Sequence, residues 1–273
     1  MFSVRSAVVC LVLSLPATSP AEAQETCGNG PVTPTHRIGV PIPSPTTATV
    51  RPVVTLTPLQ ADASTLAVVL EGVVLPARAG TATRAIQTDV LAGLRDTPAT
   101  FVASDEKPDR HGRRRGIVRL EEGDSLGERL LHAGAGLADV SFAPCADRFL
   151  AAEARARAEK RGVWRQSRIW TDLNAAATGL PDFVLGRGKV ASVGRSGRTT
   201  YINFGDNFRT DATVRLREAL TSSLVAAGQP PESLSGRMIE VRGWARWRDG
   251  LDLELDTPAA LRLWDEATDR ETD

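Results

Sequence analysis

The chain has 273 residues, of which 42% are apolar and 24% are charged, as in folded globular proteins rather than disordered ones. Its 33 basic and 33 acidic residues leave no net charge, which argues against an obligatory nucleic-acid partner, because such proteins usually carry a basic excess. At about 100–200 residues per domain, this length predicts one or two domains with a core of useful size.

The N-terminus has the pattern of an export signal. Arg5 precedes an apolar run over residues 7–15, and a small-x-small cleavage site follows at residues 21–23. The run supplies about half of the ~20 residues that a bilayer-crossing helix needs. We therefore expect a signal peptide over residues 1–23, a periplasmic or secreted mature chain, and no membrane span after cleavage.

Cleavage would remove Cys10 and leave Cys27 and Cys145 as the cysteines of the mature chain. Exported proteins fold in oxidising compartments, where a remaining cysteine pair commonly forms a disulfide. We expect a Cys27–Cys145 disulfide, and two unrelated thiols are the alternative.

The mature chain begins with a segment rich in proline and threonine, residues 24–52, which predicts an extended linker because proline fixes φ and lacks an N–H donor. The pattern of apolar residues then alternates between strand and helix spacing up to residue 166. The expected elements are a strand at 65–75 broken at Gly72, a helix at 82–94, strands at 100–103 and 116–120, and helices at 126–133 and 146–161.

A second domain is expected over residues 182–264, after a polar connector at 167–181 and before a charged tail at 265–273. Its strands are expected at 183–193, 199–204, 237–247 and 251–255, with a helix at 217–227. Short strands with one interposed helix predict a small closed β-barrel of the OB type.

The first domain resembles a known family in a series of ordered motifs. Asp109-Arg110-His111-Gly112-Arg113 precedes strand 116–120, and Glu153-Ala154-Arg155 and Gly162-Val163-Trp164 follow. Staphylococcal nuclease (thermonuclease) domains run D-x-Y-G-R, a strand, a helix, E-x-x-A-R and G-x-W. The resemblance covers residues 53–166 and implies an α+β, mainly β fold, in which an OB-type barrel carries packed helices. The second domain resembles the barrel appended to some bacterial members.

The positions that carry the family's chemistry differ in this chain. The resemblance places Val69 at a phosphate-binding arginine, Val74 at a calcium-ligating aspartate and Ala77 at the general-base glutamate, and residues 55–58 contain no carboxylate where the family has D-G-D-T. Calcium requires several hard oxygen ligands, and general-base assistance is worth about 10²–10⁴-fold in rate. The resemblance therefore implies that the calcium site and the catalytic residues are lost, and we expect no cofactor.

Arg113 matches a phosphate-contacting arginine of the family, and Arg110 and Arg114 lie beside it. A guanidinium group can bind a phosphate through its donor fork but cannot hydrolyse it. The alternative is a solvated surface arginine. Glu71 and Asp62 lie near the altered site, and a different metal site built on them remains an open alternative.

The second domain has an unusual density of aromatic and basic residues. A stacking platform with a basic groove is one interpretation. Strand alternation favours the other, in which alternate residues are simply core: Tyr201 and Asn203 lie on one side of the strand, and Ile202 and Phe204 on the other. The residues in question are Tyr201, Phe204, Phe208, Trp244 and Trp247 with Arg209, Arg242, Arg246 and Arg248.

Three functions follow from these patterns. The leading hypothesis is an exported, catalytically degraded thermonuclease-like protein that acts in binding or scaffolding, with weak nucleic-acid binding or an envelope protein as its partner. The second is an active, divergent nuclease that hydrolyses DNA or RNA with other acids. The third is a structural envelope protein that contacts no nucleic acid.

Overall fold

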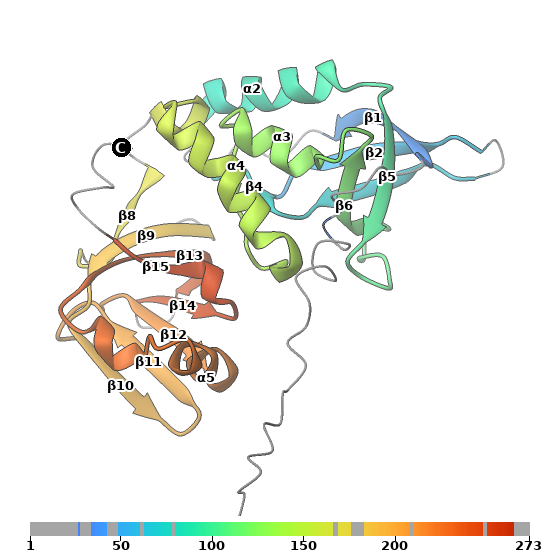
Figure 1. The fold of residues 1–273 in the computed structure, drawn as a ribbon. Coiled ribbons are helices and arrows are strands. Elements are labelled where there is room, and N and C mark those ends of the chain that lie inside the picture. The colour runs from blue at the N-terminus through green and yellow to red at the C-terminus, as the bar shows by residue number, and fades with distance from the viewer. Residues whose placement is uncertain are drawn as a thin grey trace, which may run out of the picture.

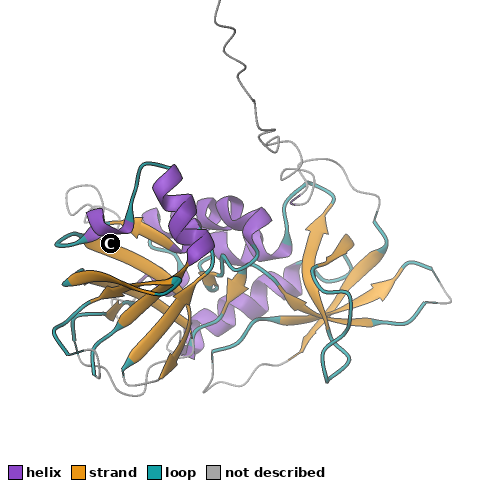
Figure 2. Ribbon diagram, turned by 90° about the horizontal axis from the view of Figure 1, so that it is seen from below, coloured by secondary structure: helices purple, strands orange, loops and turns teal. Residues whose placement is uncertain are grey.

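The computed structural model describes Cys27 and residues 34–42, 49–60, 63–77, 80–165, 169–175, 183–207, 210–247 and 250–264. The expected signal peptide at residues 1–23 and the tail at 265–273 lie outside these ranges. The described part is a mixed α+β structure in which a closed five-stranded barrel and a curved eight-stranded sheet, called the second barrel below for its strand order, flank a group of helices (Figure 1). The view turned by 90° also places the helices between the barrels (Figure 2).

The first barrel is closed by five strands, and its topology is that of an OB-like barrel. Neighbouring strands of this barrel are antiparallel, with one exception. The third and fifth strands in chain order, which are neighbours in the barrel, run parallel. Helix α2 (Gly80–Gly93) connects the third strand region to the fourth. Around the barrel the strands are β1 (His36–Ile42), β2 (Val53–Pro58), β3 (Leu66–Leu70), β6 (Arg114–Leu120) and β5 (Pro98–Ala103).

The chain turns sharply where the sequence pattern predicted a break in the third strand. Gly72 separates β3 from β4 (Val73–Val74) and has a φ of +81°, which favours glycine. A Cβ atom at this position would lie 2.1 Å from the ring of Phe149, so glycine is also required by the close approach of α4 (Ala146–Ala158). The turn therefore fixes where this helix meets the barrel.

Two helices close the first domain. Helix α3 (Leu126–His132) begins with a capping box, in which Ser125 and Glu128 satisfy each other's backbone N–H groups. Helix α4 follows the short η2 (Ala143–Cys145) and ends before η3 (Gly162–Arg165). None of the helices in the described ranges has the length and apolar character needed to cross a bilayer.

The second barrel repeats the strand order of the first. Its third and fifth strands, β12 (Thr213–Arg217) and β14 (Leu251–Leu255), are again parallel, and α5 (Glu218–Ala226) again follows the third strand. Only residues 190 and 191 separate β9 from β10, so the two strands together correspond to the first strand of the first barrel. β9 pairs with β13 and β10 pairs with β11. The other strands are β9 (Phe183–Lys189), β10 (Ser192–Ser196), β11 (Thr199–Asn203) and β13 (Met238–Trp247).

Short elements complete the structure and join its parts. β4 pairs with β7 (Leu137–Ala138), and β15 (Leu261–Leu263) pairs with β13. β8 (Thr171–Asp172) lies within the segment predicted as a connector at residues 167–181 and pairs with β9 in parallel. The η5 (Pro231–Leu234) and η6 (Pro258–Ala260) turns lead into β13 and β15, respectively.

The structure differs from the sequence prediction at several places. No strand was predicted at residues 53–58, which form β2. His36–Ile42, from the segment predicted as a linker, forms β1, because Ile38 is fully buried in the barrel core and β1 pairs with two strands. The strand predicted at residues 183–193 is divided into β9 and β10. Strand β12 was not predicted, because its alternating Val214 and Leu216 are too few to form a clear pattern.

The expected cysteine pair is joined in the structure. Cys27 and Cys145 form a disulfide with a Cα–Cα distance of 5.3 Å, and the Cys27 carbonyl accepts a hydrogen bond from Arg148 Nη1 at 3.0 Å. Both cysteines are buried in the core of the first domain. The bond therefore ties the segment before β1 to the start of α4.

We expect oxidised mature protein to show no thiol that reacts with an alkylating reagent under denaturing conditions until it is reduced. Because the disulfide closes a loop of 118 residues, its removal in the Cys27→Ser/Cys145→Ser variant should lower the free energy of unfolding by roughly 2–5 kcal/mol. Intact mass after alkylation tests for free thiols, and urea unfolding measures the loss of stability. Alkylation of both cysteines without reductant would show that the pair is not bonded.

Candidate functional site: the region between the barrels

The three positions implied as degraded catalytic residues lie along one short stretch of the first barrel. Val69 is in β3, and Val74 is in β4 and fully buried. The backbone N–H of Ala77 donates to Thr49 Oγ1 at 3.1 Å. Val74 shares a hydrophobic cluster with Phe183 of the second barrel. Val74 is therefore inaccessible to solvent, in a cluster that extends from the first domain to the second barrel.

Glu71 lies beside this stretch and is held between two arginines. Its Oε1 accepts from Arg115 Nη2 at 2.7 Å and from Ser104 Oγ at 3.0 Å, and its Oε2 lies 3.8 Å from Arg51 Nε. Two neighbouring guanidinium groups oppose a divalent cation at the same carboxylate. Asp62, its proposed partner in a metal site, lies outside the described residues. Within the described ranges, no group of three or more His, Cys, Asp or Glu residues could hold a metal ion.

The arginines of the turn after β5 make hydrogen bonds and ion pairs with other residues of the same turn. Arg113 Nη2 lies 2.7 Å from Asp109 Oδ2, and Asp109 Oδ1 accepts from the backbone N–H groups of His111 and Arg113. Arg114 Nη2 donates to the carbonyl of Asp105 at 3.0 Å, and Arg110 Nε donates to His111 Nε2 at 3.1 Å. A phosphate at this turn would have to compete with these internal partners.

The lowered pKa of Asp109 reflects its hydrogen bonds with Arg113. The hydrogen bonds from the Arg113 side chain and backbone lower the pKa of this carboxyl to about 2. Because the folded pKa lies below the unfolded value, the interaction contributes at any pH above about 4 and is lost as pH falls through about 2. We expect an NMR titration of the Asp109 carboxyl to give a midpoint near 2, and Arg113→Ala to raise it toward the ordinary value of 3.8. An unchanged midpoint in the variant would show that Arg113 does not hold Asp109.

A buried ion network joins α4 to β13 across the boundary between the barrels. Glu153 Oε1 pairs with Arg242 Nη1 at 2.7 Å, and Arg242 Nη2 pairs with Glu240 Oε1 at 3.0 Å. The three side chains are 3%, 5% and 2% exposed, in that order. Glu153 also accepts a short hydrogen bond from the backbone N–H of Ala138. These three side chains are therefore buried, and each carboxylate has a cationic partner.

Further arginines converge on Glu240. Arg262 Nη2 lies 2.6 Å and Arg157 Nη1 lies 3.3 Å from Glu240 Oε2. Burial by itself would raise the pKa of Glu240, but the charges of Arg242, Arg262 and Arg157 outweigh it and lower the pKa. The pKa of Arg242 is raised, because Glu153 and Glu240 outweigh the effect of its burial. Glu240 and Arg242 thus stay ionised at neutral pH.

A second contact across the boundary involves Trp244. Its indole Nε1 donates to Asp139 Oδ2 at 2.9 Å, and the guanidinium of Arg51 lies over its ring, 4.7 Å from the centroid. Arg51 also makes a short ion pair with Asp139. Burial alone would raise the pKa of Asp139, but Arg51, Trp244 and Ser141 outweigh it and lower the pKa. Asp139 therefore connects the two barrels as an ionised acceptor.

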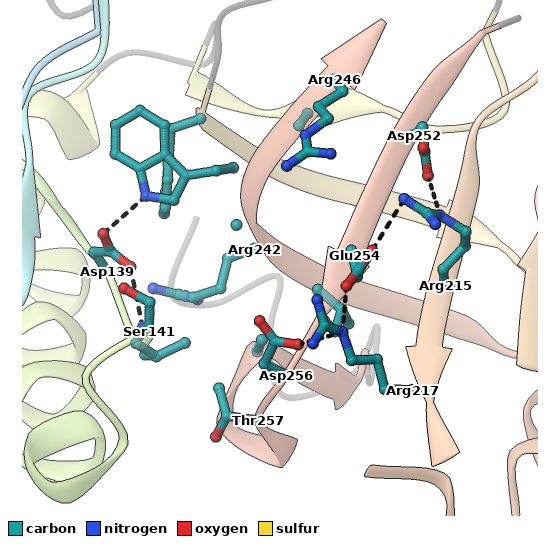
Figure 3. A pocket seen from close by; sticks show the side chains of 17 residues that line it. Asp139, Ser141, Arg215, Arg217, Arg242, Arg246, Asp252, Glu254, Asp256 and Thr257 are labelled. Atoms are coloured by element: carbon teal, nitrogen blue, oxygen red, sulfur yellow. Dashed lines mark hydrogen bonds and ion pairs between the residues drawn. The ribbon is translucent and has the colours of Figure 1, made fainter. Parts of the chain in front are cut away.

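A groove of about 310 Å³ opens beside this contact. The segment of Asp139 and Ser141 forms one wall, and β12, β13 and β14 of the second barrel form the other (Figure 3). Arginines and carboxylates line the groove in equal number: Arg215, Arg217, Arg242 and Arg246 with Asp139, Asp252, Glu254 and Asp256.

Most of the charged groups in the groove are paired with one another. Arg215 Nε lies 2.6 Å from Asp252 Oδ1, and Arg217 Nε lies 3.3 Å from Asp256 Oδ1. Glu254 joins both arginines, with Arg215 Nη2 at 3.1 Å. Arg246 is exposed and has no hydrogen bond or ion pair within the described part of the chain. The groove is therefore polar, charge-balanced and open to solvent at Arg246.

The aromatic residues flagged in the second domain do not form a single platform. Phe204 is buried in the barrel core, and Trp244 packs at the boundary between the barrels. Tyr201 is half-buried on the outer side of β11, and Trp247 is 53% exposed at the end of β13. Phe208, Arg209 and Arg248 lie outside the described residues. The core interpretation is thus confirmed for Ile202 and Phe204 only.

The sequence patterns singled out Glu153, Arg242 and Trp244, but they did not predict that Glu153 pairs with Arg242 or that Trp244 bonds to Asp139. Glu153 and Trp244 stand 91 positions apart, and no local pattern links them. The groove was not predicted either. The available signal was the alternation of charge along β12 and β14, where every second residue is charged.

We expect Arg242→Met to lower the free energy of unfolding by roughly 3–5 kcal/mol, because it leaves two buried carboxylates without their shared partner. Arg198→Met is a matched control, since Arg198 is 86% exposed and pairs at the surface with Glu218. That substitution should change stability by no more than about 0.5 kcal/mol. Urea unfolding at neutral pH measures both, and equal small effects would show that the network does not stabilise the protein.

No protein-family model matches this chain. No curated protein sequence matches it either.

Proposed function

We propose that this protein is an exported, non-catalytic relative of the staphylococcal nucleases that acts as a binding or scaffolding module. The observation that carries the proposal is the burial of Val74. The residue at the implied calcium-ligand position is fully buried in a cluster with Phe183 and Leu185 of the second barrel. A phosphodiester could not reach this position while the barrels are docked.

The architecture of the first domain supports the relationship. An OB-like barrel with a helix between its third and fourth strands, followed by two packed helices, is the arrangement that the motif resemblance implies. Trp164, from the G-x-W motif, is 7% exposed and packs in the same cluster as Val74. The motif residues thus serve packing in this chain, which is consistent with a domain kept for its fold.

The alternative of a divergent active nuclease requires free acids near the site. The neighbouring carboxylates are each engaged by a guanidinium group: Glu71 by Arg115, Asp139 by Arg51 and Asp109 by Arg113. A general base must accept a proton from water, and an ion-paired carboxylate with a lowered pKa is a weaker base. These pairs favour a binding role over hydrolysis.

Two parts of the proposal rest on the sequence. The envelope location follows from the export signal at residues 1–23. Nucleic acid is the ligand that the resemblance suggests, through Arg110, Arg113 and Arg114. Because the turn already satisfies these arginines and the chain is neutral, any such binding should be weak and should fade with salt, in the range of about 10⁻⁴–10⁻⁶ M.

We expect purified mature protein to give no calcium-stimulated cleavage of single-stranded DNA or RNA above a buffer control, because the residues implied as ligands and base are Val74 and Ala77. The measurement is release of a fluorophore from a quenched oligonucleotide with calcium or with EDTA. Cleavage that copurifies with the protein and that EDTA abolishes would overturn the proposal and favour the active nuclease.

The Val74→Asp variant sharpens this test. A carboxylate at this buried position without a partner should cost several kcal/mol of stability, of the order of 3–5 kcal/mol, and calcium should not restore it. Val74→Ala is the control, which removes the same packing without a charge. Calcium-dependent recovery of stability in Val74→Asp, absent from Val74→Ala, would show that the site is still open to the ion.

A further inference from the structure

The outer surface of the second barrel beside the groove combines an uncovered aromatic ring with neutral polar side chains. Tyr201, the chain's only tyrosine, is half-buried on β11 between Gly194 of β10 and Arg215 of β12. A side chain at Gly194 would meet nothing within 4 Å. Strand β10 therefore leaves one side of the Tyr201 ring open.

Hydroxyl and amide groups lie next to this ring in a row across three strands. Asn203 is in register with Ser192 on one side and Thr213 on the other. Its Nδ2 donates to Ser192 Oγ at 3.2 Å, and its Oδ1 accepts from Thr213 Oγ1 at 3.4 Å. Such groups can both donate and accept hydrogen bonds, as sugar hydroxyls do.

Arg215 connects this surface to the groove, because it is the strand neighbour of Tyr201 and also lines the groove. On its other side it is in register with Glu254, which lies between Asp252 and Asp256 on the same side of β14. These carboxylates are paired with Arg215 and Arg217, and the groove as a whole is lined by equal numbers of arginines and carboxylates. It therefore lacks the excess of positive charge that a phosphate backbone would select.

Paired carboxylates and guanidinium groups suit a neutral polyhydroxyl ligand. Each ligand hydroxyl can donate to a carboxylate oxygen and accept from a guanidinium N–H without burying a net charge. The groove volume of about 310 Å³ is at the lower end of the range of ligand sites. It is therefore suited to a small terminal unit rather than to a large ligand.

We propose that the groove and the adjoining outer surface of β11 bind an uncharged oligosaccharide. A terminal sugar unit occupies the groove between Glu254 and Arg246, the chain crosses Arg215 of β12, and a later unit stacks on the open side of Tyr201. The strands involved, β11 and β12, are the second and third of this barrel, which form the ligand surface in OB barrels generally. The inference deepens the proposed binding role of this protein by naming a ligand class.

The test uses the full mature protein and three neutral probes: cellotetraose, maltotetraose and the β-1,4-linked tetramer of N-acetylglucosamine. Trp244 lines the groove, so its fluorescence should change on binding, and calorimetry gives the affinity. We expect saturable binding of at least one probe with little dependence on salt. Tyr201→Ala should weaken it about tenfold, whereas Tyr201→Phe should stay within about threefold, because the ring remains.

Glu254→Gln tests the groove, and Arg198→Gln, on the surface of the same barrel, is the matched control that should leave binding unchanged. Thermal melting of each variant separates loss of binding from loss of fold. The proposal is overturned by no saturable binding of any probe up to about 1 mM, or by binding that Tyr201→Ala and Glu254→Gln leave intact. It is also overturned if labelled oligothymidine binds the groove in a salt-dependent manner that Arg246→Gln abolishes.

These results are independent of the nuclease assay. If no tetrasaccharide binds and no calcium-dependent cleavage is seen, the oligosaccharide site is ruled out and the non-catalytic role is retained. Cleavage activity together with tetrasaccharide binding would overturn the non-catalytic role and keep the site in the second barrel.

Discussion

The arrangement of the two barrels depends on the buried contact between Glu153 of α4 and Arg242 of β13. A carboxylate and a guanidinium group are costly to remove from water, and the cost is offset only when both find well-placed partners. Here Glu240 and the backbone of Ala138 supply those partners. Because Arg242 meets Glu153 and the Ala138 carbonyl only when the barrels are docked, the network favours one orientation of the second barrel on the first.

The same docking determines what the first barrel can do. Val74 and Leu75 share their hydrophobic cluster with Phe183 and Leu185, so this side of the first barrel is an internal surface in this chain. Arg51 also lies at this boundary, where it contacts Asp139, Glu71 and the Trp244 ring. These charged groups are thus part of the interface between the barrels.

The groove exists only because two separate barrels meet. One wall comes from the segment after β7 and the other from β12, β13 and β14. The second barrel alone would present its paired charges on an open surface, and the wall formed by Asp139 and Ser141 gives that surface depth. A ligand in the groove would contact both domains, so its binding should stabilise their docking.

The sequence by itself indicated most helices and many strands and the disulfide, because apolar spacing, Gly72 and the cysteine count are local or compositional signals. It singled out Glu153 through a family motif, and Arg242 and Trp244 through the density of basic and aromatic residues. It missed β1, since prolines at its ends conceal a buried Ile38, and it missed β2 and β12, which are short. Only the tertiary structure decided that Val74 is fully buried and that Arg113 is held by Asp109. The burial of Val74 depends on residues that are distant in the sequence, and the pairing of Arg113 depends on the conformation of its turn. Neither can be inferred from the type of side chain at one position.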